Sequence, residues 1–259
     1  MSPTPLPLPF IRIPDVSNFR SVTVPGIRPQ LLFRSAQLSQ ISSAGATIIQ
    51  DLGIKTIYDL RTSHQFGLDT GLDSAIEGHG IRRFLVPVYS EETCPPKILE
   101  ELAVISHAST RETRTRSHSI YLMYAPKAYG LVLKHLATEN KLTPLLVHCR
   151  GGEGRTGLLI AIILALCGVP RDLIALEYSL THADLSSIGT ESAECVLGPL
   201  GWDVDLEAKA KSLSFIHESI DIVFEIMDTT YGGITGYVKN YCGLSDEEIE
   251  MIRKNLTMN

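Results

Sequence analysis

The sequence predicts an α/β fold with a central, mostly parallel sheet flanked by helices and a helical C-terminal third. Three observations lead to this prediction. A short apolar strand at 143–148 runs directly into a glycine-rich loop and then into an all-apolar helix at 156–167, which is a typical α/β unit. A β-branched segment at 54–60 has the length of a buried strand. After Pro170 almost every segment has a helical pattern, and Ser245 with Glu248 forms a capping box for the last helix.

Length and composition indicate one globular domain over residues 1–259. The chain is 44% hydrophobic and 20% charged, and it has no internal repeat and no linker that would divide it. Residues 1–14 are rich in proline and are expected to form an extended arm. The net charge of −6 argues against a general nucleic-acid binder, because such proteins are basic.

The cysteines indicate a reducing compartment. The five cysteines are far apart and form no C-x-x-C pair, so we expect neither a disulfide framework nor a metal site. The N-terminus lacks the basic start and apolar core of a signal peptide. The longest apolar segment, 158–169, is shorter than the roughly 20 residues that cross a bilayer. We therefore expect a cytoplasmic protein without stable membrane insertion, and the sequence does not determine its oligomeric state.

The remaining elements follow from local signals. The expected order is a strand at 31–33, a helix at 42–53, the strand at 54–60, a loop at 62–80, a strand at 81–88, and helices at 95–105 and 121–136. Pro87 places its strand near a sheet edge, and Pro126 marks a helix start or a kink. The polar, basic segment at 109–117 is expected to be a solvated loop rather than a docking patch for phosphate or lipid.

The segment between the strand and the apolar helix contains the residues that predict an anion-binding site. Gly151, Gly152 and Gly154 allow successive backbone N–H groups to face one anion. The N-terminus of the following helix adds partial positive charge, and Arg155 offers a planar fork for two phosphate oxygens. The predicted phosphate-binding residues are Arg150, Gly151, Gly152, Glu153, Gly154 and Arg155.

Cys149 is the predicted nucleophile. A thiol beneath this anion cradle should have a pKa well below the usual value of about 8.5, and the Thr156 hydroxyl can donate to its sulfur. The alternative is that Cys149 is only a small buried hydrophobic residue, but the glycines and arginines around it argue against an apolar site. Cys167, inside the apolar helix, is expected to belong to the core.

The loop HC-x5-R-[ST]-G is similar to the signature of the cysteine-dependent tyrosine phosphatase superfamily. The chain resembles the atypical tyrosine/serine phosphatase branch, which includes mycobacterial secreted and fungal proteins, over almost its full length. The elements that carry this resemblance are Asn18–Arg20, Phe33–Leu38, Gly53–Arg61 and the two C-terminal segments YGGITGYV and GLSDEEIEMIRKNL. The resemblance implies a tyrosine-phosphatase-like three-layer sandwich and phosphocysteine chemistry without a cofactor or metal.

The loop departs from that branch at two positions. Glu153 stands where the branch has a lysine associated with phosphoinositide recognition, and Gly154 where it has an aspartate, the expected proton donor. If Glu153 points inward it opposes an anion; if it is shielded it can replace the missing acid. A third departure is Gln65, where the DLR element normally ends in glutamate.

No carboxylate is singled out as the general acid. The candidates are Asp69, Asp73, Glu91, Glu92 and Glu153. Asp59 and Arg61 end a strand, so they either line the pocket or form a structural ion pair. His148 is expected to position Cys149 and tune it electrostatically.

These observations predict a phosphomonoester hydrolase, and a protein tyrosine/serine phosphatase in particular. The partner would be a phosphorylated protein or a small phosphorylated molecule. Two alternatives remain open: a phosphate-binding pseudophosphatase, and an enzyme redirected to a phosphoinositide or a specialised metabolite.

Overall fold

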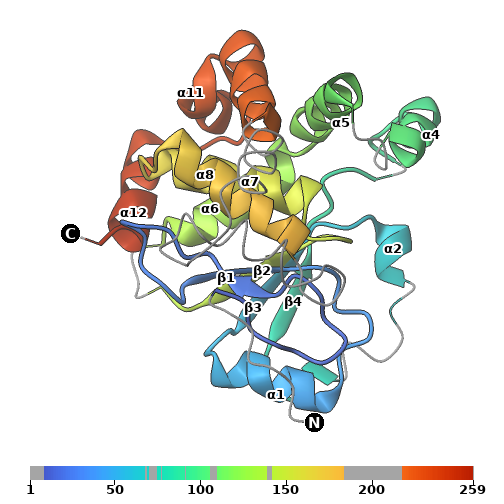
Figure 1. Ribbon diagram of the computed structural model, residues 1–259, viewed down its shortest axis with the longest axis vertical. Helices are drawn as coiled ribbons and strands as arrows, with labels where there is room; N and C mark the ends of the chain where they lie inside the picture. The colour runs from blue at the N-terminus through green and yellow to red at the C-terminus, as the bar shows by residue number, and fades with distance from the viewer. Residues whose placement is uncertain are drawn as a thin grey trace, which may run out of the picture.

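A computed structural model describes residues 9–67, 69, 75–76, 78–90, 92–105, 110–138, 142–183 and 218–258. Its sheet has five strands in the order β1-β2-β5-β3-β4 (Figure 1). The strands are β1 (Arg20–Ser21), β2 (Leu32–Ser35), β3 (Thr56–Asp59), β4 (Arg82–Leu85) and β5 (Leu145–His148). All neighbours pair in parallel except β1, which is antiparallel to β2. The predicted α/β class with a mostly parallel sheet is confirmed.

The register of the parallel strands aligns their carboxyl ends. His148 pairs with Ser35 of β2 on one side and with Asp59 of β3 on the other. Because ligands of open α/β sheets bind beyond this edge, the loop after β5 lies where a site is expected. β4 is an edge strand, as Pro87 indicates.

Each face of the sheet is buried by a different part of the chain, because successive strand residues point to opposite faces. Leu145 and Val147 belong to the larger apolar cluster, and Leu146 to the smaller one. The smaller cluster includes residues of α1 (Ser43–Asp51), which lies below the sheet in Figure 1. Helices α6, α7, α8 and α12 lie above it and give the three-layer arrangement.

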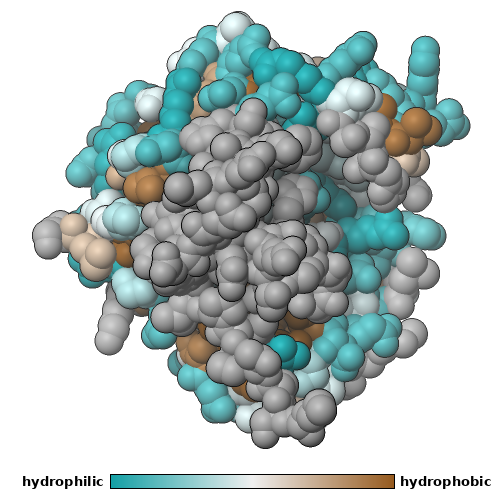
Figure 2. Space-filling model, in the orientation of Figure 1, coloured by the Kyte–Doolittle hydropathy of each residue, from teal (hydrophilic) through white to brown (hydrophobic). Residues whose placement is uncertain are grey.

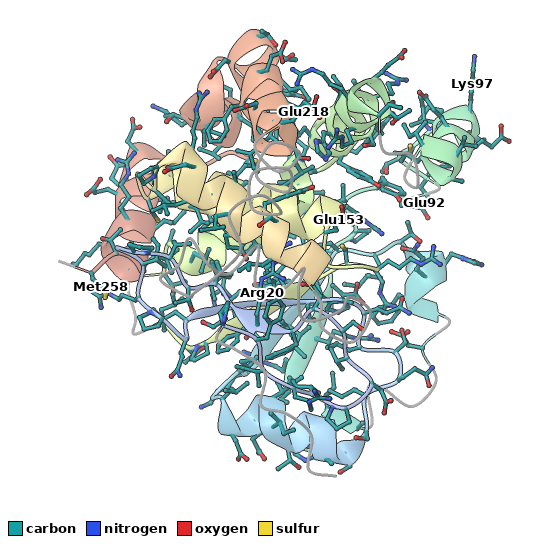
Figure 3. The ribbon with its side chains drawn as sticks, in the orientation of Figure 1. Arg20, Glu92, Lys97, Glu153, Glu218 and Met258 are labelled. Carbon is teal, nitrogen blue, oxygen red and sulfur yellow. The ribbon has the colours of Figure 1, made fainter. Side chains whose placement is uncertain are left out.

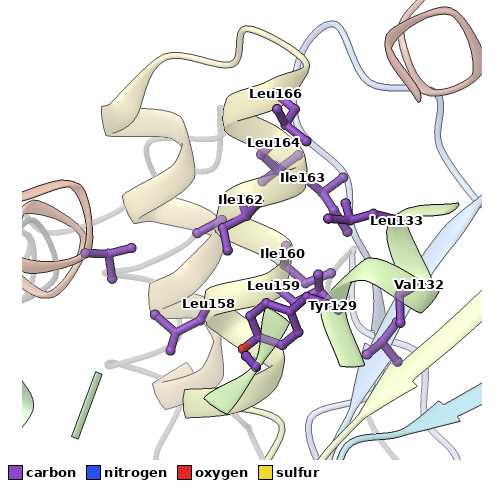
Figure 4. Packing of buried hydrophobic residues seen from close by; sticks show 14 of the residues in the cluster. Tyr129, Val132, Leu133, Leu158, Leu159, Ile160, Ile162, Ile163, Leu164 and Leu166 are labelled. Atoms are coloured by element: carbon purple, nitrogen blue, oxygen red, sulfur yellow. The ribbon is translucent and has the colours of Figure 1, made fainter. Parts of the chain in front are cut away.

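The helix after the glycine-rich loop, α7 (Gly154–Leu166), is apolar on all sides. Every residue of it except Gly154 and Ala165 is buried. Figure 4 shows its leucine and isoleucine side chains beside Tyr129, Val132 and Leu133 of α6 (Pro126–Leu136). Burial on this scale holds the helix rigidly and fixes the position of its N-terminus.

The other helices are α2 (Ser63–Gly67), α4 (Pro96–Ile105), α5 (Arg111–Tyr124), α8 (Arg171–Ser179), the 3-10 turn η1 (Leu180–Ala183), α11 (Gly233–Asn240) and α12 (Asp246–Leu256). Residues 218–226 are helical and continue into the π-helix Met227–Tyr231. The expected capping box is present: Ser245 and Glu248 each accept from the other's backbone N–H. The helical C-terminal region is thus confirmed for the described residues beyond Pro170.

The prediction of a loop at 109–117 is wrong. Thr110 caps the N-terminus of α5 by accepting from the Thr113 N–H. The basic side chains that suggested a loop pair with acidic residues of neighbouring helices, as Arg116 does with Glu101 at 2.6 Å and Arg114 with Glu218. The basic segment is therefore a capped helix whose charged side chains face acidic neighbours rather than a solvated loop.

Three further segments are compared with their expected structure. The segment at 62–80, expected as a loop, begins with helix α2. The helical segment expected at 121–136 is divided between two helices: α5 ends at Tyr124, and Pro126 marks the start of α6, one of the two options that the sequence left open. The end of the N-terminal arm packs on the fold: Phe10 and Ile13 are buried and form bridges with Arg20 and Val16.

The described surface is mostly hydrophilic on the face shown in Figure 2, with separate small hydrophobic patches. Among the described helices, none has both the length and the apolar character needed to cross a membrane.

Candidate active site

The predicted phosphate loop lies between β5 and α7 and borders a cavity. Cys149 follows β5 and is 3% exposed. A cavity of about 620 Å³ is lined by this cysteine together with Thr62, His64, Gln65, Tyr89, Leu99, Leu102, Ala103, Tyr121, Arg150, Gly151, Glu153, Gly154 and Arg155. The structure therefore brings the predicted nucleophile, the arginine and most of the loop to one opening.

Two glycines of the loop are required for different reasons. Gly152 has φ +70, and a Cβ there would lie 2.7 Å from Asn18 Nδ2, so the loop can pass only if this residue has no side chain. At Gly154 a Cβ would lie 3.0 Å from Cε2 of Tyr121. The ring of Tyr121 therefore occupies the space into which a larger residue at 154 would extend.

Arg155, in the first turn of α7, lines the cavity. Its Nη1 donates to Gln65 Oε1 at 3.2 Å and to the Leu60 carbonyl at 3.4 Å, and its guanidinium lies 5.4 Å from the centre of the Tyr89 ring. Tyr129 donates to the Arg155 carbonyl at 2.6 Å. Burial alone would lower the pKa of Arg155, but Cys149 and neighbouring groups raise it, so the side chain is a fixed cation. Gln65, one of the departures, therefore contacts the predicted phosphate-binding arginine directly.

The Thr156 hydroxyl is fully buried. It has no hydrogen-bond partner among the described residues, Cys149 included. An unpartnered buried hydroxyl costs free energy, and this one lies in the first turn of α7, directly after Arg155.

His148 holds the backbone of the loop. Its Nδ1 donates to the Cys149 carbonyl at 3.1 Å, whereas Nε2 lies 3.5 Å from Asp59 Oδ2 without hydrogen-bond geometry. Burial lowers the pKa of His148 although Asp59 opposes this shift. The imidazole is therefore neutral near pH 7, with its proton on Nδ1, which is a positioning arrangement.

Asp59 and Arg61 form a buried ion pair next to the site. Arg61 bonds Asp59 at 2.8 Å and also pairs with Asp69, which in turn pairs with Arg83 at 2.7 Å. Burial would raise the pKa of Asp59, but His148 and Arg61 outweigh it and lower the pKa. Neither Asp59 nor Arg61 lines the cavity, so both lie in the layer behind it.

The structure separates the candidates for the general acid. Burial raises the pKa of Asp69, but hydrogen bonds from Arg61, Ser39 and Arg83 lower it to about 2, so Asp69 is a permanent anion. Glu92 lines a different cavity, and in Figure 3 it lies out toward α4, away from Glu153. Asp73 and Glu91 lie outside the described residues. Glu153 is exposed and lines the same cavity as Cys149.

The other described thiols differ from Cys149 in their surroundings. Cys94 and Cys242 are buried, and burial raises the pKa of both, to about 12 for Cys242. Cys167 caps the end of α7, packs against the larger apolar cluster, and has its pKa raised to about 12, again by burial. Cys195 lies outside the described residues.

Sequence reasoning missed three residues behind the loop. Asn18 Nδ2 donates to the Gly151 carbonyl at 3.0 Å, Arg34 donates to the Gly152 carbonyl, and Glu177 pairs with Arg34 at 2.6 Å. Asn18 and Arg34 belong to the elements that carried the resemblance, but nothing in their spacing indicates a contact with residues more than a hundred positions away.

A thiol that shares one cavity with a guanidinium and a glycine-rich loop is suited to chemistry on a phosphoryl group, and the class that this fold and site define is the cysteine-dependent phosphatases. The sequence model of the tyrosine phosphatase family matches residues 11–258, and the chain belongs to that family.

Two characterised proteins are similar over most of the chain. The triple specificity protein phosphatase PtpB of Mycobacterium tuberculosis is 26% identical over 271 residues, which cover 93% of this chain and 96% of that protein. A tyrosine-protein phosphatase of Nostoc commune is 22% identical over 225 residues, which cover 86% of this chain and 73% of that protein. The chain is thus a phosphatase that works through a cysteine, as the family does.

Proposed function

We propose that this phosphatase hydrolyses phosphotyrosine and phosphoserine esters of proteins, with Cys149 as the nucleophile. The observation that carries the proposal is the shared cavity: Cys149, Arg155 and the glycine-rich loop line one opening at the carboxyl edge of the sheet. The names of the two similar proteins, both protein phosphatases, support the same substrate class.

In the first step the Cys149 sulfur attacks phosphorus, so a P–S bond forms while the P–O bond to the leaving group breaks. The guanidinium of Arg155 and the loop amides balance the charge on the phosphoryl oxygens in the transition state. The side chain of Arg150, which is exposed at the opening of the cavity, adds a second cation there.

Glu153 is the proposed proton donor to the leaving oxygen. Of the described carboxylates, it is the one that lines the cavity with Cys149. It lies at the N-terminal end of α7 (Figure 3). In the second step the same carboxylate takes a proton from water, which attacks phosphorus and releases phosphate. Thr156 donates to sulfur as the P–S bond breaks.

The walls of the cavity favour an aryl ester. Tyr89 and Tyr121 are stacked with ring centres 6.1 Å apart, and Leu99, Leu102 and Ala103 of α4 add apolar surface. A phenol ring can bury its faces on such walls, whereas a polyanionic inositol phosphate would meet few cations there.

The proposal includes a cytoplasmic location and a reaction that needs no metal. The four described cysteines are free thiols, which supports a reducing compartment.

The test compares the natural protein with Cys149→Ser and Arg155→Lys on aryl phosphates. Cys149→Ser should lose at least about four orders of magnitude in kcat yet bind tungstate as before, because the amide cradle remains. Arg155→Lys should lose nearly as much as Arg155→Ala, because lysine keeps the charge but not the fork. Tungstate binding without any turnover of a low-pKa aryl phosphate by the natural protein would identify a pseudophosphatase instead.

A further inference from the structure

Consecutive carbonyls of the phosphate loop are anchored by hydrogen bonds, all but one of them from groups outside the loop. The His148 carbonyl accepts from the Leu60 N–H at 2.9 Å, and the Arg150 carbonyl accepts from the Gln37 N–H at 2.9 Å. The next two carbonyls are held by side chains: Gly151 accepts from Asn18 at 3.0 Å and Gly152 from Arg34. Together with the contact from His148 to the Cys149 carbonyl, this anchors every carbonyl from 148 to 152.

Anchored carbonyls determine where the amide N–H groups point. In a planar trans peptide, C=O and N–H point in opposite directions. When Asn18 holds the Gly151 carbonyl, the Gly152 N–H is turned to the other side, and Arg34 orients the Glu153 N–H in the same way. Among the described residues, the N–H groups of Arg150, Gly151 and Gly152 donate to no protein group, so they are available to an anion.

The two side-chain anchors are joined by one buried carboxylate. Glu177 of α8 pairs with Arg34 at 2.6 Å and with Arg20 at 3.0 Å. Arg20 in turn donates to the Asn18 Oδ1, which leaves the amide nitrogen of Asn18 to donate to the loop. These four residues are almost completely buried, and Figure 3 shows Arg20 inside the molecule between the sheet and α8.

Backbone strain at Asn18 indicates that its side chain matters. Asn18 has φ 58, a left-handed conformation that is costly for residues other than glycine and is best tolerated by asparagine. Glycine would relax this position but would remove the amide that holds Gly151. The strain is therefore retained at the residue that contacts the loop.

We propose that Asn18 and Arg34, linked through Arg20 and Glu177, are positioning residues that turn the amides of Gly152 and Glu153 toward the phosphoryl oxygens. This inference rests on the proposed function of the loop as an oxyanion cradle. It gives a role in catalysis to Asn18, which lies just before β1, and to residues of β1, β2 and α8, none of which lines the cavity.

The test uses Asn18→Gly in the full chain, with Gln30→Gly as the matched control. Gln30 has φ 59 and is exposed, so both substitutions relax a left-handed residue, but only one removes a loop anchor. Gln30→Gly should unfold at or above the temperature of the parent, whereas Asn18→Gly should unfold somewhat below it, because the buried Arg20 loses an acceptor. Both variants are therefore compared with the parent at a temperature at which all three are folded. Asn18→Gly should weaken tungstate binding about tenfold and lower kcat/KM for p-nitrophenyl phosphate by about tenfold or more, since one misplaced oxyanion donor costs up to 10²–10³ in rate. Gln30→Gly should change neither.

Asn18→Asp is the second variant. It keeps the shape and still accepts from Arg20, but it presents an acceptor to the Gly151 carbonyl, so tungstate binding should weaken more than in Asn18→Gly. The tungstate-induced shift of the Gly152 amide in 15N–1H NMR spectra should shrink in both variants, which a purely structural role would not cause.

The outcomes separate the two proposals. Folded Asn18→Gly protein with tungstate affinity and kcat/KM within twofold of the parent would overturn the positioning role while leaving the phosphatase intact. A parent that binds tungstate without hydrolysis, and more tightly than Asn18→Gly, would support the positioning role and overturn the proposed catalysis. A parent that does not bind tungstate would overturn both.

Discussion

Two buried clusters of arginine and carboxylate lie on either side of β5. One stabilises the ends of strands, and the other stabilises the phosphate loop. On the β3–β4 side, Arg61 and Arg83 pair with Asp59 and Asp69 and fix the ends of two strands. On the β2 side, Arg20 and Arg34 share Glu177, and this cluster reaches the phosphate loop itself.

Both clusters are built from buried ion pairs, but only the second one contacts the phosphate loop. The first one lies behind the cavity. The first cluster has two carboxylates, so either arginine retains a partner if one carboxylate is lost. The second cluster depends on one carboxylate that pairs with both arginines. Arg34 donates directly to a loop carbonyl, and Arg20 donates to Asn18, which donates to the preceding loop carbonyl. A change in the second cluster should therefore affect both folding and oxyanion binding.

The largest expected effect on stability is that of Glu177→Gln, compared with Asp69→Asn. Removing the shared carboxylate breaks two buried ion pairs, and we expect a loss of about 3–5 kcal/mol in the free energy of unfolding. Asp69→Asn should lose about 1–2 kcal/mol, because Arg61 keeps Asp59. Urea unfolding of both variants measures the two losses. Equal losses would show that the clusters do not differ in the way described.

In both clusters the paired arginines lower the pKa of a buried carboxylate, so both contribute stability that is lost in acid, and Asp69 of the first cluster gives the sharper test. The pKa of Asp69 is about 2 in the folded state against 3.8 unperturbed, so its contribution is fully present above about pH 4 and is lost as the pH falls toward 2. We expect about 1–2 kcal/mol of acid-sensitive stability from this residue after solvent screening. Asp69→Asn should show correspondingly less loss between pH 4 and 2 in urea unfolding, and identical acid profiles would refute the assignment.

The smallest expected effect is that of substituting Glu153 in the phosphate loop, next to the second cluster. Glu153→Lys replaces an exposed anion by a cation at the opening, so phosphate should bind about threefold more tightly at low salt. The same substitution removes the proposed acid, so kcat should fall on esters with poor leaving groups and change little on good ones. Glu153→Gln is the control that removes the acid without adding a cation. A kcat that is insensitive to both would exclude Glu153 as the proton donor.

Local and periodic signals predicted much of the fold. The β-branched strand, the apolar helix after the loop and the Ser245 capping box all involve residues that are close in sequence, and each is present. The failure at 109–117 has a different cause: the basic side chains indicated a solvated loop, whereas Arg116 and Arg114 pair with Glu101 and Glu218 of distant segments, which sequence reasoning cannot place.

The site shows the same division. The loop residues were found because nucleophile, glycines and arginine are contiguous. Sequence alone could not decide whether Asp59 and Arg61 line the cavity or form an ion pair, and it could not exclude Asp69 as the general acid. Both answers depend on contacts with Arg83 and His148 on other strands. The fit of Gly154 against Tyr121 is likewise a contact between distant segments.

The central claim is that a phosphoryl group is transferred to the sulfur of Cys149. Rapid acid quenching during turnover of an aryl phosphate, followed by peptide mass spectrometry, measures this directly. The account predicts one phosphoryl group on the peptide that contains Cys149, formed within the first turnover and missing from Cys149→Ser. Continued hydrolysis with no phosphorylated Cys149, or with the phosphoryl group on another residue, would contradict it.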